Sequence, residues 1–345
     1  MSIHNILVIG NGFDLYHGLK TKYIDFVDYT RYTTKANGTK KIRKIIRNNL
    51  FINWFKTVAN ENQGWIDCEI EIEKILMLFR KIIYDKDVFT LQGEKHYILK
   101  DNTSLLYFEY SMLGVFKEFV SIDKEVEGYE FNNNYFTKYQ GIIKSKMLEK
   151  LRSELEDLTI VFRFYLQNEV LDKDGDIVSK QILNIKPEYV INFNYTNTYK
   201  KYGIRDQNVC FIHGSVDKNN MILGIKDTDE RDIDFIHFKK FFQRIQKKSD
   251  LIDTSRFEYE KFIMNGEYLE KNEVYIHFFG HSLSDTDGDI IRNVCTGVDK
   301  IFIYYVGNKD NTDYEQKVIN IINVLGKENA IESIQTGRIQ FIKIK

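Results

Sequence analysis

The sequence predicts an α/β protein with a mostly parallel sheet, helices on both faces of the sheet, and a large helical insertion after the first βα unit. Several short runs of β-branched and aromatic residues are almost continuously apolar, as strands covered on both faces are. Helix-length stretches separate the later runs, and this alternation favours a doubly wound, Rossmann-like arrangement. The predicted strands are residues 3–9, 189–193, 209–212, 274–279 and 301–306, with 339–344 as a sixth at an edge.

The stretch between the first and second predicted strands is too long for a single crossover, and it divides the chain. Apolar spacing predicts helices there, most clearly in the last of them. These helices are residues 41–58, 70–83, 105–119 and 146–170. The expected organisation is a Rossmann-like nucleotide-binding core of residues 1–34 and 185–345, interrupted by a mainly helical insertion of residues 35–184.

Composition narrows the class of protein. Cys68, Cys210 and Cys295 form no C-x-x-C pair, which excludes a sulfur-ligated structural zinc site and fits a reducing compartment. A net charge of −1 provides no global field to attract nucleic acid or an anionic membrane. No run approaches the roughly 18 apolar residues that span a bilayer, and the start lacks the features of a signal peptide. We therefore expect a cytoplasmic protein without a membrane segment, and predict no metal requirement.

A glycine-rich turn follows the first predicted strand. A buried strand, two closely spaced glycines and a helix form the layout of a nucleotide-binding βα turn, in which backbone amides approach phosphates. Leu15 replaces the third glycine of the dinucleotide fingerprint and no P-loop lysine follows, so a tight turn without a ligand stays open as an alternative. The candidate binding residues are Gly10, Asn11, Gly12, Phe13 and Asp14.

Polar residues follow two later strands, at the edge where open parallel sheets place their ligands. Asn194, Tyr195 and Thr196 can bond ribose hydroxyls or a water, or can simply form an Asx turn and a helix cap. His213, placed before Gly214 at a strand end, can expose its ring in a cleft and act as a general base, although an isolated histidine is more often structural.

A fourth motif repeats the logic of the first turn. Gly280, Ser282, Asp285 and Asp287 lie between a predicted strand and a predicted helix. Their backbone and side chains can contact a ligand. A plain helix cap explains the two aspartates equally well.

Three charged features lie outside these turns. Trp65, Asp67 and Glu69 open an acidic stretch that can reach the cleft or form a solvated helix face. Residues 35–47 carry six basic side chains and none that is acidic, and residues 238–248 form a second basic cluster. Such clusters can contact nucleic acid. Charge runs usually face solvent, however, and the net charge argues against a nucleic-acid partner.

In this order, the motifs resemble the AbiH family of bacterial abortive-infection proteins. The resemblance extends from the first strand to about residue 306 and is specific because the motifs occur in combination. The matching segments are IGNGFDL at 9–15, HGL at 17–19, Tyr23, WIDCE at 65–69, FNYTNT at 193–198, IHG at 212–214 and FGHSLSDTD at 279–287.

More distantly, the series is similar to the sirtuin-like NAD-binding fold. The resemblance implies that Asn194 stands for the catalytic asparagine beside the nicotinamide ribose and His213 for the general base. It implies that Gly280 and Ser282 form the late phosphate and ribose loop. The chain has no zinc cysteines, and Thr196 stands where an acidic residue is usual, which argues against peptide deacylation.

The resemblance therefore implies an antiphage abortive-infection protein that hydrolyses NAD to nicotinamide and ADP-ribose on infection. NAD would be bound as substrate or as ligand. Two alternatives stay open, namely a nucleotide-binding sensor without turnover and a toxin that targets nucleic acid through the basic insertion. A phage-derived trigger and assembly into a homo-oligomer also stay open.

Overall fold

The computed structural model divides into two compact units, which are described separately. The first unit comprises residues 1–22, 166–222 and 243–345, and the second comprises 23–165 and 223–242. The expected borders lay at residues 34/35 and 184/185. The structure describes residues 3–33, 38–61, 67–84, 89–92, 96–99, 118–123, 128–132, 134–137, 141–171, 177–226, 233–249, 263–264, 267–268, 273–307 and 311–345.

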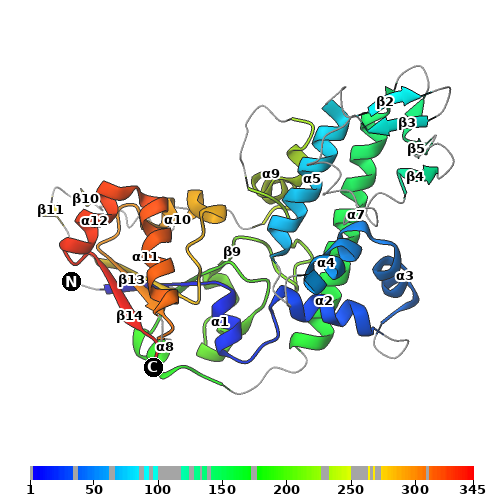
Figure 1. The fold of residues 1–345 in the computed structure, drawn as a ribbon. Helices are drawn as coiled ribbons and strands as arrows, with labels where there is room; N and C mark the ends of the chain where they lie inside the picture. Colours follow the sequence, from blue (N-terminus) through cyan, green and yellow to red (C-terminus); the bar gives the residue numbers. More distant parts are fainter. Residues whose placement is uncertain are drawn as a thin grey trace. The chain divides into compact units, whose positions relative to one another are not determined.

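The first unit is built on a six-stranded sheet in which every neighbouring pair is parallel. The spatial order is β14-β13-β12-β1-β8-β9, and Figure 1 labels β13, β14 and β9 of this sheet. If the six strands are numbered 1 to 6 along the chain and read from the β9 edge, the order is 3-2-1-4-5-6, which is that of the Rossmann fold. The topological switch point lies between β1 and β12. The strands are β1 (Ile3–Ile9), β8 (Tyr189–Asn192), β9 (Val209–Phe211), β12 (Glu273–Phe279), β13 (Lys300–Tyr305) and β14 (Ile339–Lys343). Each lies within one residue of its predicted bounds, and the α/β prediction is confirmed.

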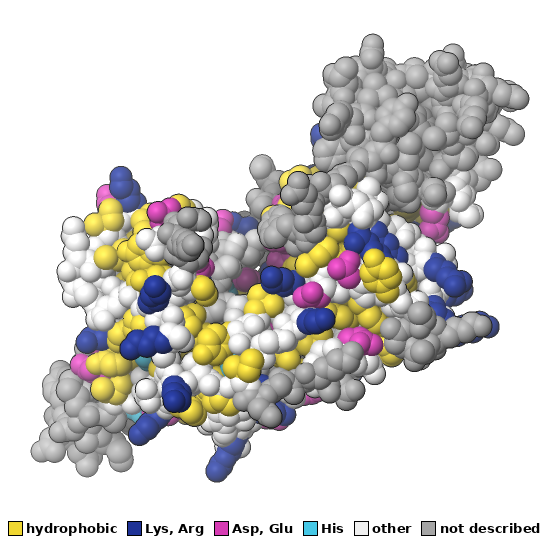
Figure 2. Space-filling view, turned by 60° about the horizontal axis from the view of Figure 1, so that its bottom comes forward, with side chains coloured by type: hydrophobic (Ala, Val, Ile, Leu, Met, Phe, Trp, Pro, Cys, Tyr) yellow, Lys and Arg dark blue, Asp and Glu magenta, His cyan; other side chains and the backbone are white. Residues whose placement is uncertain are grey.

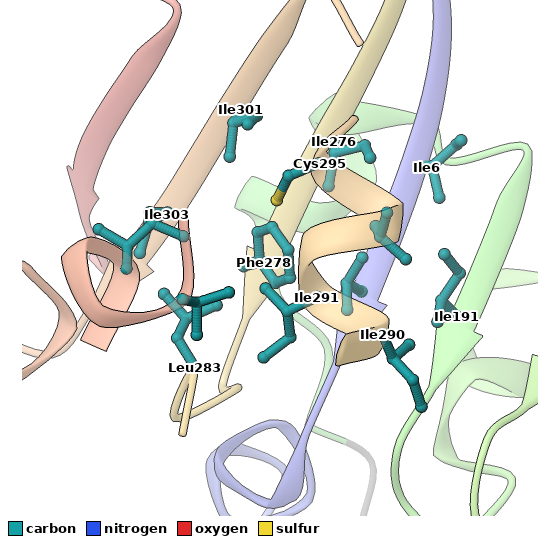
Figure 3. Packing of buried hydrophobic residues seen from close by; sticks show 14 of the residues in the cluster. Ile6, Ile191, Ile276, Phe278, Leu283, Ile290, Ile291, Cys295, Ile301 and Ile303 are labelled. Atoms are coloured by element: carbon teal, nitrogen blue, oxygen red, sulfur yellow. The ribbon is translucent and has the colours of Figure 1, made fainter. Parts of the chain in front are cut away.

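Helices cover both faces of this sheet, because successive side chains of a strand point to opposite faces. Ile6 and Val8 of β1 pack in one apolar cluster with α10 and α11, part of which is seen in Figure 3. Leu7 and Ile9 pack in the other cluster, with Phe13 of α1. The helices of this unit are α1 (Asn11–Tyr16), α8 (Lys180–Ile185), α10 (Gly288–Cys295), α11 (Thr312–Leu325) and α12 (Lys327–Gln335), with the π-helical turn η1 (Leu166–Val170) and the 3-10 turns η3 (Thr198–Tyr202), η4 (Asp206–Asn208) and η7 (Asp285–Asp287).

Four strands of the sheet end in register. Ile9 pairs with Phe279 on one side and with Asn192 on the other, and Asn192 pairs with Phe211. The turns that follow these strands therefore leave the sheet at one level. This register brings the four sequence motifs to a single edge.

The second unit is largely helical, as expected for most of the insertion. It contains α2 (Tyr23–Tyr32), α3 (Lys40–Asn48), α4 (Leu50–Glu61), α5 (Cys68–Tyr84) and α7 (Lys144–Tyr165), and residues 223–242 add η5 (Ile236–Phe238) and the start of α9 (Lys240–Lys247). The helix predicted over 41–58 is two helices, because Asn49 interrupts it. The Asn49 side chain accepts a hydrogen bond from the Ile52 amide at 3.0 Å and donates one to the Glu154 carbonyl at 2.6 Å. Asn49 thus caps α4 instead of continuing α3.

The insertion also contains β structure that the sequence analysis missed. A four-stranded antiparallel sheet has the order β2-β3-β5-β4. Its strands are β2 (Phe89–Gln92), β3 (His96–Leu99), β4 (Val120–Asp123) and β5 (Gly128–Phe131). A short pair in the insertion is formed by β6 (Phe136–Thr137) with β7 (Gly141–Ile142), and another in the first unit by β10 (Ile263–Met264) with β11 (Glu267–Tyr268). The helix predicted over 105–119 falls mostly outside the described residues.

Polar contacts tie residues 223–242 to the rest of the second unit. Lys240 is buried, and its ammonium lies 2.7 Å from the carboxylate of Glu69. Asp234 accepts hydrogen bonds from Lys144 at 2.7 Å and from the hydroxyl of Tyr84. Glu69 is therefore partly buried and paired with a buried lysine, whereas Trp65 lies outside the described residues.

The surface carries mixed charge. The face shown in Figure 2 has Lys and Arg side chains at many separate places, between apolar and acidic ones. Over the residues that the structure describes, no helix is both long enough and apolar enough to cross a bilayer.

Candidate functional site

The candidate site lies at the carboxyl edge of the parallel sheet in the first unit. The turns after β1 and β12 flank the switch point, where open α/β sheets bind ligands. The turns after β8 and β9 follow on one side of β1. All the predicted site residues lie in these four turns or at the start of the helices that follow.

The turns after β1 and β12 are packed directly against each other. The Gly12 amide donates a hydrogen bond to the Gly280 carbonyl at 2.8 Å. Gly280 has φ +67°, and a Cβ there would overlap the Phe13 backbone nitrogen. A Cβ on Gly12 would come within 2.8 Å of the Gly280 oxygen. These glycines are therefore required by close backbone packing within the protein.

This packing occupies amides that the sequence analysis assigned to phosphates. The Phe13 amide donates to the Gly10 carbonyl at 2.8 Å, and the Gly12 amide is held by Gly280. Both groups are committed within the chain. Asn11 is exposed at the start of α1.

Asp14 joins the first turn to the turn after β8. Its side chain is only 1% exposed, and the Thr196 hydroxyl donates a hydrogen bond to its carboxylate at 2.6 Å. Thr198 donates in turn to the Thr196 hydroxyl at 3.2 Å. Asp14 and Thr196, both predicted to contact a ligand, lie in an interior hydrogen-bond chain.

Asn194 is held by the end of its own strand and by the turn after β1. The backbone amide of Asn194 donates to the side-chain oxygen of Asn192 at 2.8 Å in an Asx turn. The Asn192 side-chain nitrogen donates to the Thr196 carbonyl at 2.9 Å. The Asn194 side-chain nitrogen donates to the Gly10 carbonyl at 2.9 Å. Asn194 therefore fixes the glycine-rich turn. The neighbouring Tyr195 hydroxyl bonds to a carbonyl in the loop after β9, that of Ile222, at 2.6 Å.

His213 and Asp287 form a buried pair across the sheet edge. His213 follows β9 and its side chain is 6% exposed, while Asp287, at the start of α10, has a side chain that is 12% exposed. The His213 Nε2 lies 3.1 Å from the Asp287 Oδ1. Among the described residues, the buried His213 Nδ1 has no hydrogen-bond partner. The predicted general base thus has a carboxylate partner, and the predicted ligand residue Asp287 supplies it.

Two residues of the site were missed by the sequence analysis. The Phe193 ring packs edge-on against His213 at 5.6 Å and against His281 at 4.3 Å between ring centroids. His281 is 4% exposed, and its Cα lies so close to Gly10 that a Cβ on that glycine would approach to 2.8 Å. The signal was available, because His281 directly follows Gly280 in the fourth motif.

Helix α11 supports the turn after β12. The ammonium of buried Lys317 donates to the His281 carbonyl at 2.9 Å, and the Asn320 side chain donates to the Ser282 carbonyl at 2.8 Å. Burial lowers the pKa of Lys317, while the nearby Asp313 carboxylate raises it. Ser282 itself is exposed, as is Asp285. These two predicted ligand residues lie at the outer surface of the turn.

The described residues include no group of three or more His, Cys, Asp or Glu side chains that could hold a metal ion. Burial raises the pKa of Cys68 well above its ordinary value and raises that of Cys295 to about 12. Neither thiol is therefore an activated nucleophile.

Comparison with known proteins agrees with the order of the motifs. No curated protein and no solved structure matches the chain. The family model described as bacteriophage abortive infection AbiH matches residues 6–305. This span begins within β1, includes β8, β9 and β12 with the turns that follow all four strands, and ends at the last residue of β13. The chain therefore belongs to the AbiH family of bacteriophage abortive-infection proteins.

Proposed function

We propose that this AbiH protein acts in bacteriophage defence by hydrolysing NAD to nicotinamide and ADP-ribose. The observation that carries the proposal is the buried His213–Asp287 pair at the carboxyl edge of a Rossmann-order sheet. Buried pairs of this kind, in which a carboxylate orients an imidazole, are typical of general-base sites.

The contact with Asp287 determines which of the two ring nitrogens of His213 can accept a proton. An ionised carboxylate only accepts hydrogen bonds, so the proton of the neutral ring belongs on Nε2, which faces Asp287. Nδ1 then keeps its lone pair. A buried polar atom without a partner calls for a functional explanation, and we assign the Nδ1 of His213 as the proton acceptor.

The reaction needs one water and one base. Water attacks C1′ of the nicotinamide ribose, and the bond from C1′ to the pyridinium nitrogen breaks. Its electron pair neutralises the ring, so nicotinamide leaves without a general acid. The water proton passes to Nδ1 of His213, and the oxocarbenium-like transition state resembles that of other glycoside cleavages.

The remaining residues have supporting roles in this proposal. The side-chain nitrogen of Asn194 holds the Gly10 carbonyl, and its oxygen can accept a hydrogen bond from a ribose hydroxyl. Asn11, Ser282 and Asp285 are exposed, and in this proposal they contact the nucleotide. The sensor alternative uses the same residues for binding, without the step at His213.

Two features of the site accord with an activity that is switched on only during infection. Nδ1 of His213 is enclosed, and the amides of Gly12 and Phe13 are bonded within the chain. Entry of NAD therefore requires the turns after β1 and β12 to separate. An enzyme that depletes NAD harms its own cell, so a closed resting state serves the function.

The proposal is tested by incubating NAD with purified protein, with and without phage lysate, and separating nicotinamide and ADP-ribose by chromatography. We expect release by the wild type and at least about a hundredfold less by His213→Ala. His4→Ala is the matched control, because His4 lies at the opposite end of β1. If NAD raises the melting temperature but no product forms in either condition, the protein is a sensor and the hydrolase proposal is wrong.

A further inference from the structure

The two basic clusters of the sequence differ in how their side chains are used in the structure. In the cluster at residues 238–248, Lys240 pairs with Glu69 at 2.7 Å and Arg244 with Asp289 at 3.3 Å. Lys247 donates to the carbonyl of Met221 at 2.7 Å. These cations serve internal contacts.

The other cluster forms an exposed basic face on α3. Lys40, Lys41, Lys44 and Arg47 are all exposed. Among the described residues, none of the four forms an ion pair with a carboxylate. A nearby carboxylate, that of Glu154, is buried and already bonded to Lys150 and to the Leu50 amide.

This arrangement works against the stability of the helix itself. Lys40 and Lys41 occupy the first turn, which contains no acidic residue, and cations there oppose the helix dipole. Lys40 and Lys44 are four residues apart, where like charges repel each other. Within the described structure no carboxylate pairs with these cations. We therefore look to a partner outside the chain for the compensating negative charge.

The apolar face of α3 distinguishes between two possible anionic partners, a membrane surface and a nucleic acid. Ile42, Ile45 and Ile46 are 4%, 8% and 5% exposed and pack into the second unit. A basic helix that binds a membrane needs its apolar face for insertion, and here that face is already used. A phosphodiester chain needs only the cations. Lys40, Lys44 and Arg47 lie along one side of the helix and span about 10 Å.

We propose that the basic face of α3, formed by Lys40, Lys41, Lys44 and Arg47, binds the phosphate backbone of a nucleic acid. Recognition through phosphates alone carries no sequence information. The basic face belongs to the second unit and the His213–Asp287 pair to the first, and the proposal stands whether or not NAD is hydrolysed. It gives the AbiH chain a means of contacting RNA or DNA during infection.

The test measures affinity for a labelled single-stranded RNA and a labelled DNA duplex over a range of salt concentrations. Four phosphate contacts predict a slope of log affinity against log salt of about −2.8 for the single strand and about −3.6 for the duplex. Comparing the two affinities at one salt concentration shows whether the protein prefers the single-stranded RNA or the DNA duplex.

The decisive variant is Lys40→Glu/Lys44→Glu/Arg47→Glu, compared with Lys186→Glu/Arg205→Glu/Lys327→Glu. Both change the net charge equally, and all six residues are exposed. We expect the α3 variant to bind at least about tenfold more weakly, with most of the salt dependence lost, while the control resembles the wild type. A Gln version of the α3 variant repeats the test without adding negative charge.

Equal losses in the α3 and control variants would mean that only net charge matters, and would overturn the proposal. It would also be overturned by binding to vesicles of phosphatidylcholine and phosphatidylserine but to neither nucleic acid. Circular dichroism and melting temperature establish that each variant is folded before binding is compared.

Discussion

The Nε2 atom of His213 lies 3.1 Å from the Oδ1 atom of Asp287, although 73 positions separate the two residues in the chain. His213 follows β9, and Asp287 lies after β12 and directly precedes α10. The pairing joins turns from opposite sides of β1. It brings two separately predicted candidate residues into direct contact.

Under the proposed NAD hydrolysis, Asp287→Asn should reduce nicotinamide release by about a hundredfold or more, with little change in KM. The amide carries no charge to stabilise the protonated ring and can reverse the tautomer by donating to Nε2. Asp289→Asn, the same change two positions later on the exposed side of α10, is the control. Equal activity of the two variants in steady-state kinetics would show that Asp287 does not act through His213.

Gly280→Ala should destabilise the first unit far more than Gly297→Ala. Both glycines have positive φ, +67° and +75°, so each substitution costs roughly 1–2 kcal/mol for the backbone alone. The added methyl at Gly297 meets no atom within 4 Å, whereas at Gly280 it overlaps Phe13. Overpacking adds about 1–3 kcal/mol. Urea unfolding of the two variants measures the difference, and equal costs would refute the tight contact between the turns.

Lys317→Met should weaken the turn after β12. The substitution keeps most of the apolar stem but leaves the His281 carbonyl without its buried donor, which costs about 1–3 kcal/mol. Turnover should fall with stability, because the same turn leads to Asp287. Lys327→Met, at an exposed position, should change the free energy of unfolding by less than about 0.5 kcal/mol. Thermal unfolding and NAD turnover of both variants provide the comparison.

His277 should make the protein less stable as the pH falls below about 6.5. Burial lowers the pKa of His277 to about 4 in the folded chain, from the ordinary histidine value of about 6.5. The unfolded chain therefore binds more protons between these values, and stability declines as the pH decreases through this window. Between pH 7.5 and pH 5 the loss should be about 2 kcal/mol.

The neutral form of His277 also fits its contacts. Its Nε2 lies 3.1 Å from the Asn5 side-chain oxygen, and its Nδ1 lies 3.3 Å from the Tyr304 hydroxyl. A neutral ring with its proton on Nε2 donates to the Asn5 oxygen and accepts from the Tyr304 hydroxyl. His277→Gln removes the titrating group and should flatten the decline in urea unfolding measured across this pH range. An unchanged decline would assign the effect to other groups.

Local sequence patterns were sufficient to predict the sheet. Nearly continuous apolar runs define buried strands, and their ends are marked by polar or glycine residues, so the six strands could be placed within one residue. The antiparallel strands of the insertion were missed because the runs around Phe89 and Tyr129 are short and mixed with polar residues. The break at Asn49 was missed because its effect depends on Glu154, over a hundred positions away.

The sequence by itself determined that polar and glycine-rich turns follow the strands of an α/β sheet, because strand periodicity and turn chemistry act over a few residues. It could not show which turn contacts which. Only the tertiary structure decided that Gly12 faces Gly280, that Asp14 bonds to Thr196, and that His213 meets Asp287. Those contacts depend on strand order and register, which are set by packing across the whole sheet.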